Sequence, residues 1–396
     1  MSLTEKTIDI IKATAPIVEE NVTELSKRFY PILFERYPGT KIFFNQAHIS
    51  NGTQPRAIAA SIVEYANAID NIDAIKTLVN NIADKHASMN IKPAQYSIVN
   101  TCLLDVIVDI LGNAGTPEVK SAWKEAIENF ANIIIDAESK KYEETLAKEG
   151  GWKGYKSFIV TDKVNESSLI TSFYLEPADG KTVVTCRAGQ YISIMLELPE
   201  GGIVFRNYSL SCSPNGKYYR ISVKREENGV VSNYLHNKIS AGDKIRVNPP
   251  YGRLYLNETD KPAVLISGGV GITPMMSILQ NAADQQLCKQ IHFIHGTPDK
   301  NTHAFKENVI AITSDHDNLK HHFFYSRNSV NSADTQGGRI SINSIKEIVD
   351  HNKDAEFYLC GPAQMMKDLY RELSNWGVTP NNIIYEYFGP KRDITG

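Results

Sequence analysis

The 396-residue sequence is poor in cysteine, and its five cysteines are scattered along the chain. No two of them have the C-x-x-C spacing typical of zinc ribbons and iron–sulfur clusters, so neither kind of centre is expected. An odd number of dispersed cysteines also argues against a disulfide framework. The cysteine content therefore favours a reducing, cytoplasmic compartment.

Long apolar runs and an excess of positive charge are absent as well. The apolar runs are far shorter than the about 18 residues that a spanning helix needs, and the first residues, with Glu5 and Asp9, lack the apolar stretch of a signal peptide. With 42 basic and 45 acidic residues the net charge is −3, which argues against general nucleic-acid binding. Small molecules are the expected partners, and nothing in the composition demands an oligomer, so we expect a monomer.

Glycine is rare at the start of the chain, where only four of the 25 glycines precede Gly150. Before that point apolar residues recur at helical spacing, whereas short β-rich runs follow it. From Ala263 apolar strands alternate with helix-like segments, which is typical of a parallel sheet. We predict a multidomain protein with an all-α domain (1–148), an antiparallel β-barrel (152–258) and a doubly wound α/β domain (259–396).

The segment AVLISGGVGITPMMSIL of the third domain has the pattern of a strand, a glycine turn and a helix. Gly268, Gly269 and Gly271 would let the backbone close against a pyrophosphate, with Thr273 capping the helix and Pro274 in its first turn. A glycine turn that merely connects two elements is the alternative, because Pro274 replaces the third glycine of the usual fingerprint.

A second strand–turn–helix pattern, FYLCGPAQMM, favours the functional interpretation. Gly361-Pro362, directly after Cys360, would open a helix at the carboxyl end of a strand, which is where open α/β sheets bind ligands. The third domain is therefore predicted to bind a dinucleotide.

The middle domain carries the motif RNYSL and, later, VKREENGVVSNYL with a Ser232-Asn233 turn. Arg206 could bind a flavin phosphate and Tyr208 could stack on a flavin ring, although an exposed Arg and Tyr on a surface strand are common. The order of these motifs along the chain resembles that of the ferredoxin–NADP reductase superfamily. The order is RxYS, SN, GGVGxTP, CGP and a terminal aromatic residue. This resemblance implies that NAD(P)H binds across Gly269, Gly271, Thr273 and Cys360–Pro362. It also implies that FAD binds near Gln190, Tyr191, Arg206, Tyr208, Ser209, Ser232, Asn233, Glu386 and Phe388.

His86 is the histidine of interest in the first domain, because it shares the apolar stripe of Ile75, Leu78, Val79 and Ile82. A buried, hydrogen-bonded core histidine is the ordinary explanation of such a position. Tyr96 and Glu138 are polar groups in helices otherwise built to pack, and an iron-bound imidazole needs an acceptor to orient it.

Tyr30, Phe44 and Gln54 could line the other side of a pocket for a flat macrocycle. Tyr30 lies beside an inward stripe, Phe44 follows Phe43, and Gln54 stands at the start of a helix on its buried face. Pro31 directly after Tyr30 should bias that residue away from helical backbone.

Ten motifs occur in one order along nearly the whole chain and resemble the flavohaemoglobin family, a globin fused to an FAD- and NAD(P)H-binding reductase. They are KIFFNQ, NGTQPRAIA, ADKHASMNIKPAQY, AESKKY, EGGW, RNYSL, VKREENGVVSNYLH, SGGVGITPM, YLCGP and YEYFGP. The resemblance implies one haem b with His86 as proximal ligand and Tyr30, Tyr96 and Glu138 as catalytic residues. It also places Phe44, Gln54 and Ile58 in the haem pocket and Lys85 at the haem–flavin boundary.

The activity that the resemblance implies is nitric oxide dioxygenation, in which NO and O2 become nitrate at the expense of NAD(P)H. Two alternatives stay open: an NAD(P)H-dependent flavin, ferric or hydroperoxide reductase, and an O2 carrier or sensor. A carrier is disfavoured because it has no use for a reductase. Ser326 and Arg327 follow a strand where a 2′-phosphate could sit, so NADPH is an option, although the resemblance favours NADH.

Overall fold

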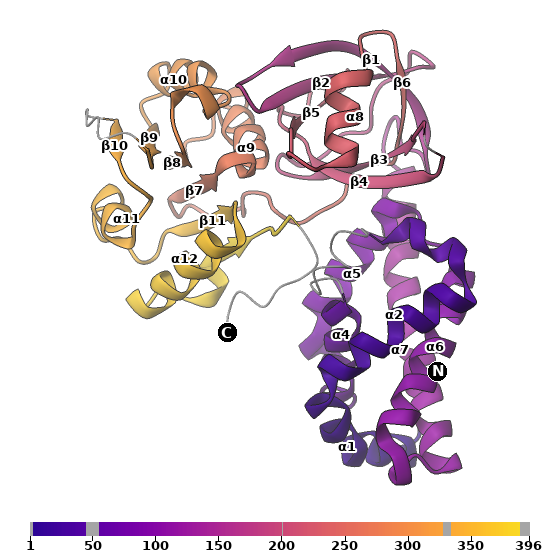
Figure 1. Ribbon diagram of the computed structural model, residues 1–396. Coiled ribbons are helices and arrows are strands. Elements are labelled where there is room, and N and C mark those ends of the chain that lie inside the picture. The colour runs from indigo at the N-terminus through magenta and orange to yellow at the C-terminus, as the bar shows by residue number, and fades with distance from the viewer. Residues whose placement is uncertain (1–2, 45–54, 200, 328–333, 389–396) are drawn as a thin grey trace. The chain divides into compact units, whose positions relative to one another are not determined.

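The computed structural model describes residues 3–44, 55–199, 201–327 and 334–388 (Figure 1). The chain divides into two compact units, one built mainly from Met1–Ala147 and the other mainly from Lys148–Pro199 and Arg206–Phe388. Gln54 lies outside the described residues, so its predicted place at the start of a helix stays a prediction.

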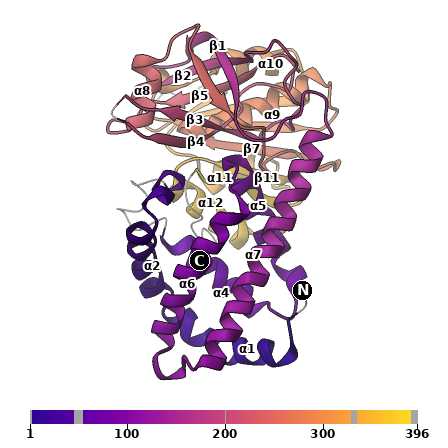
Figure 2. The same ribbon diagram turned by 90° about the vertical axis from the view of Figure 1, so that its right-hand side faces the viewer.

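The first unit is helical, as predicted. The long helix α7 packs against α1, α5 and α6 (Figure 2). Its apolar core includes the fully buried side chains of Phe29, Leu33 and Trp123. The α-helices are α1 (Glu5–Glu20), α2 (Val22–Arg36), α4 (Pro55–Asn67), α5 (Lys76–Met89), α6 (Pro93–Leu111) and α7 (Pro117–Leu146), with 3-10 turns η1 (Pro38–Phe43), η2 (Ile72–Ile75) and η3 (Gly112–Ala114).

Helix α2 runs without a break through Tyr30 and Pro31, so the expectation that Pro31 would move Tyr30 away from helical backbone is wrong. The proline penalty is local, whereas Phe29, Tyr30 and Leu33 are each at most 2% exposed. Burying these side chains on one helical face outweighs the lost backbone donor, because each fully buried large side chain stabilises the fold by about 2 kcal/mol.

Within the described residues, one helix, 93–114, is long and apolar enough to cross a membrane by length and composition alone. One face of α6, with Cys102, Val106 and Ile107, lies in the helical core. Asp105 and Asp109 on another face form ion pairs with Arg36 and Arg28, both at 2.6 Å. These contacts are typical of a core helix of a folded domain.

The second unit begins with an antiparallel sheet of six strands in the order β4-β3-β6-β1-β2-β5. An isolated antiparallel bridge between Leu210, just after β4, and Ile221 of β5 brings the two edge strands together, which closes the sheet into a barrel. The strands are β1 (Lys156–Asn165), β2 (Ile170–Pro177), β3 (Tyr191–Glu197), β4 (Ile203–Ser209), β5 (Tyr219–Lys224) and β6 (Lys244–Val247).

Ser232 and Asn233 lie in the first turns of helix α8 (Val230–Lys238), so the predicted Ser-Asn turn is wrong. The turn precedes them: Ser232 Oγ accepts from the Glu226 amide at 3.2 Å, and Asn233 Nδ2 donates to the Glu226 carbonyl at 2.9 Å. The two helical side chains thus satisfy the backbone hydrogen-bonding groups of the loop that precedes α8.

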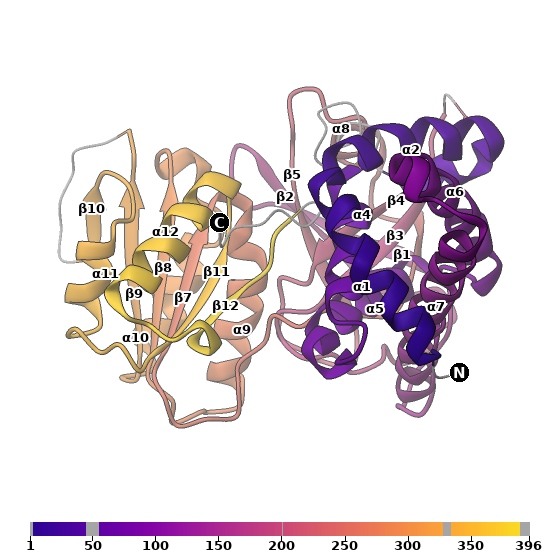
Figure 3. The same ribbon diagram turned by 90° about the horizontal axis from the view of Figure 1, so that it is seen from below.

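A fully parallel sheet of six strands completes the second unit, in the order β10-β9-β8-β7-β11-β12 (Figure 3). The order reverses between β7 and β11, which is the switch point where open α/β sheets bind ligands. The predicted doubly wound fold is confirmed. The elements are β7 (Ala263–Gly268), α9 (Ile272–Asp284), β8 (Ile291–Thr297), α10 (Lys306–Ser314), β9 (Leu319–Tyr325), β10 (Thr335–Gly337), α11 (Ile342–Ile348), β11 (Glu356–Cys360), α12 (Ala363–Trp376) and β12 (Ile383–Tyr385).

Alternate residues of the parallel strands bury against opposite helix layers. Leu265 and Phe293 pack with α9 and α10, whereas Ile266 and Ile294 pack with α11 and α12. Strand β9 begins at Leu319, although Lys320 and His321 interrupt the apolar pattern of its sequence.

Buried histidines in and beside this sheet should make the second unit labile to mild acid. Burial lowers the pKa of His303, which is 4% exposed, to about 3, and burial with the neighbouring His292 lowers the pKa of His322 to about 4. An unfolded histidine titrates near pH 6.5, so below that pH the unfolded state binds more protons and stability falls as the pH falls. His303 alone should cost about 2 kcal/mol between pH 7 and pH 5.

Urea unfolding of the full chain at pH 7, 6 and 5 measures this effect. Replacing His303 with Asn should reduce the loss of stability between pH 7 and pH 5 by about 2 kcal/mol. A loss of the same size in the variant and in the wild type would contradict the assignment.

Candidate active site

Three helices of the first unit bring His86, Tyr96 and Glu138 together. His86 Nδ1 lies 2.7 Å from Tyr96 Oη and 3.0 Å from Glu138 Oε1, and the Tyr96 hydroxyl donates a hydrogen bond to the same carboxylate oxygen. Asn90, with a left-handed φ of 55°, ends α5, and Pro93 begins α6. This tight connection turns Tyr96 back towards His86, and α7 supplies Glu138.

The cluster is arranged to fix the imidazole ring. Glu138 is 2% exposed, and burial, followed by the nearby Glu138 carboxylate, raises the pKa of Tyr96, so that Tyr96 stays protonated. Lys141 on α7 forms an ion pair with Asp84 on α5 at 2.6 Å, which ties the same two helices together beside the cluster. With Nδ1 engaged in this way, Nε2 is the ring atom left to bind a metal.

Tyr30 belongs to an aromatic cluster in the same unit. Its ring centroid lies 5.0 Å from Phe29, 5.8 Å from Phe34 and 5.4 Å from Phe44, and its side chain is buried. Burial raises the pKa of Tyr30, so its hydroxyl is a neutral donor. Ile58 of α4 packs against the same core.

Lys85 precedes His86 and is half-buried, and burial lowers its pKa. Its predicted place at a haem–flavin boundary stays a prediction. The helical unit as a whole fits a haem, because it combines an oriented imidazole, a neutral hydroxyl donor and an apolar aromatic wall.

The RNYSL motif occupies strand β4 and the residue after it. Arg206 and Tyr208 are two residues apart and share one face of the strand. Burial lowers the pKa of Arg206 and raises that of Tyr208. Ser209 Oγ is buried and has no hydrogen-bond partner within the described residues. A buried hydroxyl without a hydrogen-bond partner lowers the stability of the fold, so the position of Ser209 fits a bound group that supplies this partner.

Tyr191, Gly252 and Glu386 share a narrow space on the second unit. Gly252 has a φ of +113°, and a Cβ atom there would lie 2.8 Å from the Tyr191 ring and 3.6 Å from Glu386 Oε1. Gln190 Nε2 donates to the Gly252 carbonyl at 3.1 Å. Gly252 was not singled out from the sequence, although the NPPYG turn around it is a visible signal.

Phe388, the predicted terminal aromatic of the flavin site, is 40% exposed. An exposed aromatic face after β12 is compatible with stacking on a flat ring, and its role stays a prediction.

The two glycine turns of the parallel sheet pack on each other at the switch point. A Cβ on Gly271 would lie 2.2 Å from the Cys360 carbonyl oxygen, and one on Gly361 would lie 3.0 Å from the Gly268 amide nitrogen. Neither α9 nor α12 has a side-chain cap, so their first-turn amides are free to bind an anion. Gly269, with a φ of +51°, has open space where a Cβ would stand.

Thr273 does not cap α9, contrary to the prediction. Gly271 occupies the cap position, and the Thr273 hydroxyl donates to the Val270 carbonyl at 3.0 Å. Helix α9 starts earlier than predicted, at Ile272, because the 3-10 turn Gly269–Gly271 leads directly into it. Pro274 lies in the first turn, where it costs no helical hydrogen bond.

Ser326 and Arg327 follow β9 and are both exposed. Their amides donate to the carbonyls of Thr297 and Pro298, at 3.1 and 3.0 Å, which fixes the two residues to the end of β8. Arg327 Nη1 lies 3.6 Å from Asp299 Oδ2. The sequence reasoning missed Asp299, although the acidic residue in the TPD segment that follows the apolar run Ile291–His295 was a usable signal.

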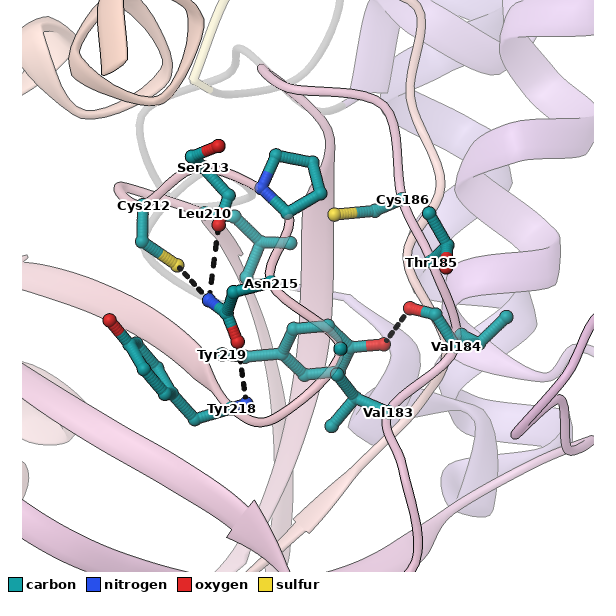
Figure 4. Close-up of a pocket in the computed structure, with 12 residues that line it drawn as sticks. Val183, Val184, Thr185, Cys186, Leu210, Cys212, Ser213, Asn215, Tyr218 and Tyr219 are labelled. Carbon is teal, nitrogen blue, oxygen red and sulfur yellow. Dashed lines mark hydrogen bonds between the residues drawn. The ribbon is translucent and has the colours of Figure 1, made fainter. Parts of the chain in front are cut away.

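A separate small pocket on the barrel is lined by Cys186 and Cys212 (Figure 4). Its walls are held by hydrogen bonds from Tyr219 Oη to the Val184 carbonyl and from Asn215 Nδ2 to the Ser213 carbonyl. Burial raises the pKa of Cys186 to about 12, and it raises the pKa of Cys212 as well. Both groups are therefore thiols rather than reactive thiolates at neutral pH. None of the predicted flavin-binding residues lines this pocket.

Three family models match the chain in succession. They are Globin over residues 27–134, Oxidoreductase FAD-binding domain over 157–255 and Oxidoreductase NAD-binding domain over 265–371. Fold and sites together thus define a globin joined to an FAD- and NAD-binding reductase, which makes the protein an oxidoreductase.

Relatives match the chain over nearly its whole length. The chain is 40% identical to a flavohemoprotein of Halalkalibacterium halodurans, over 98% of this chain and 97% of that protein, and 40% identical to one of Pseudomonas aeruginosa, over 96% of each. The chain belongs to the flavohemoprotein family, as its motifs predicted.

Two solved structures extend the comparison. The flavohemoglobin of Malassezia yamatoensis, with bound FAD and heme, matches with a TM-score of 0.88 and 25% identity over 98% of this chain and 100% of that one. The FAD/NAD-binding domain of a nitric oxide dioxygenase from Vibrio cholerae matches with a TM-score of 0.55 and 34% identity, over 59% of this chain and 99% of that one.

Proposed function

We propose that the protein is a nitric oxide dioxygenase that converts NO and O2 to nitrate at haem b, with electrons passed from NAD(P)H through FAD. The observation that carries this proposal is the His86–Tyr96–Glu138 cluster, at 2.7 and 3.0 Å from His86 Nδ1, in a chain that also contains a complete reductase. An O2 carrier needs neither a reductase nor an imidazole hydrogen-bonded to a buried carboxylate.

The proximal residues act on the imidazole. Haem supplies redox-active iron and FAD turns a hydride into single electrons, when both are bound. Glu138 accepts a hydrogen bond from the Nδ1–H group of His86, which orients the ring and would make Nε2 a stronger donor to iron. Tyr96 donates to Glu138 and holds that carboxylate in place.

The distal residues act on the gas-binding side. We propose the neutral Tyr30 hydroxyl as a hydrogen-bond donor on this side, with Phe44 and Ile58 as the apolar side chains that exclude water. Gln54 is proposed as a second polar group on this side.

In the reductase, the Ser209 hydroxyl and the Arg206 and Tyr208 side chains are proposed to bind FAD. Ser232 and Asn233 contribute by shaping the loop before α8, where they bond to backbone groups of Glu226. Gly268, Gly271 and Gly361 bring the two turns close enough for the amides of α9 and α12 to bind the pyrophosphate of NAD(P)H. We further infer module boundaries at 1–148, 152–258 and 259–396, a monomer, and a cytoplasmic location in keeping with five reduced cysteines.

The decisive experiment is NADH-driven NO consumption by protein loaded with haem and FAD, in air and without oxygen, with nitrate assayed. We expect rapid aerobic loss of NO with nitrate formed in equal amount, and little loss without oxygen. Slow loss under both conditions, together with brisk reduction of artificial acceptors, would assign the function to the reductase alone.

A further inference from the structure

The ends of two neighbouring parallel strands carry side chains of opposite charge. Asp299 follows β8 and Arg327 follows β9, and because the strands are parallel their carboxyl ends lie at the same edge of the sheet. Arg327 Nη1 and Asp299 Oδ2 are 3.6 Å apart.

Asp299 is the fixed member of this pair. Its Oδ1 accepts from the Thr302 amide at 3.1 Å, and Thr302 Oγ1 in turn lies 3.0 Å from Thr297 Oγ1 at the end of β8. The Asp299 side chain is 24% exposed, whereas that of Arg327 is 72% exposed. The Asp299 carboxylate is therefore held in place, whereas the exposed Arg327 side chain can adopt several conformations.

The position of the proposed flavin residues decides which half of the nucleotide meets this pair. Glu386, which faces Gly252 and Tyr191, follows β12, and its amide donates to the Leu359 carbonyl of β11 at 3.1 Å. With the pyrophosphate at the switch point between β7 and β11, the nicotinamide half must extend towards β11. The adenosine half then extends the other way, over the ends of β8 and β9.

We propose that Asp299 determines nucleotide specificity: its carboxylate accepts hydrogen bonds from the adenosine ribose hydroxyls, repels a 2′-phosphate and neutralises Arg327, so that NADH is preferred to NADPH. This inference rests on the proposed oxidation of NAD(P)H. The general rule for such sheets is that an acidic group selects the 2′-hydroxyl, whereas an arginine accommodates the 2′-phosphate. Here both an acidic group and an arginine are present, and the fixed Asp299 carboxylate offsets the attraction of Arg327 for a 2′-phosphate.

The test is calorimetric titration of the FAD-loaded full chain with adenosine 5′-monophosphate and with adenosine 2′,5′-bisphosphate. Asp299→Asn keeps the side-chain oxygen that accepts from Thr302 but removes the charge. We expect this variant to bind the bisphosphate about tenfold more tightly and the monophosphate a fewfold more weakly. Adding Arg327→Gln should cancel the gain in bisphosphate affinity.

Asp368→Asn is the matched control, because Asp368 pairs with Arg371 at 3.1 Å on an exposed face of α12 in the same domain. It should change neither affinity. Asp299→Ser, which can still cap the 3-10 turn η5 (Lys300–Thr302), repeats the test if the Asn variant folds poorly. The proposal would be overturned if the ratio of bisphosphate to monophosphate affinity in both Asp299 variants stayed within twofold of the wild-type ratio. Failure of every form to bind either ligand would overturn it as well.

Flavin reduction by NADH and by NADPH, followed by flavin absorbance, separates this inference from the proposed function. We expect Asp299→Asn to raise the ratio of NADPH to NADH rates by about tenfold. Because flavin reduction requires neither NO nor O2, this shift is measurable even in a protein that fails to consume NO. An unshifted ratio in a protein that consumes NO rapidly would refute the role of Asp299 alone.

Discussion

Replacing His86 with alanine should abolish NADH-driven NO consumption while NADH-driven reduction of a soluble artificial acceptor stays within about twofold of wild type. The imidazole is the one proposed protein ligand to iron, and its loss should lower NO turnover at least about a hundredfold. The residues proposed to bind the flavin and the nucleotide all belong to the second unit.

Added imidazole provides the control for this prediction. It should restore part of the NO consumption of His86→Ala and shift the haem absorbance back towards the wild-type spectrum, which a misfolded variant cannot do. Unchanged NO consumption in the variant, or parallel loss of both activities without rescue, would show that His86 does not have this role.

Replacing Lys289 with methionine should destabilise the second unit by about 3 kcal/mol. Lys289 Nζ lies 3.0 Å from Glu356 Oε2, and the two side chains are 8% and 3% exposed. Glu356 also accepts from Asn257, Thr259 and Tyr358 at 3.0 to 3.1 Å. Burial alone would raise the pKa of Glu356, but the bonds from Asn257, Lys289 and Tyr358 keep that pKa below its usual value. Without Lys289 the carboxylate stays buried with no cation beside it.

Urea unfolding followed by tryptophan fluorescence, to which Trp376 beside Phe357 of β11 contributes, measures this loss. Arg371→Met is the matched control, because it breaks the exposed pair with Asp368 and should cost less than about 1 kcal/mol. Equal losses in the two variants would mean that the buried pair contributes no more than a surface one.

Much of the architecture could be predicted from the sequence because it depends on local patterns. The scarcity of glycine before Gly150 and the helical spacing around Ile75, Leu78 and His86 predicted the helical unit, and Pro93 does begin α6. The glycine turns GGVG and CGP predicted a nucleotide-binding sheet, because backbone that must approach a pyrophosphate tolerates few other residues. Local rules failed where packing opposed them: Pro31 lies inside α2, and Ser232 and Asn233 lie in α8.

By itself, then, the sequence determined the order of the three folds, the family and the residue types of each site, since periodicity, glycine turns and motif order are properties of neighbouring residues. Only the tertiary structure decided which distant groups meet. Glu138 reaches His86 across 52 positions and Glu356 reaches Lys289 across 67, and Asp299 meets Arg327 because β8 and β9 are parallel neighbours. Such pairs depend on burial and strand order, which no local pattern encodes, because the free energy of an ion pair or hydrogen bond is set by what surrounds it in space.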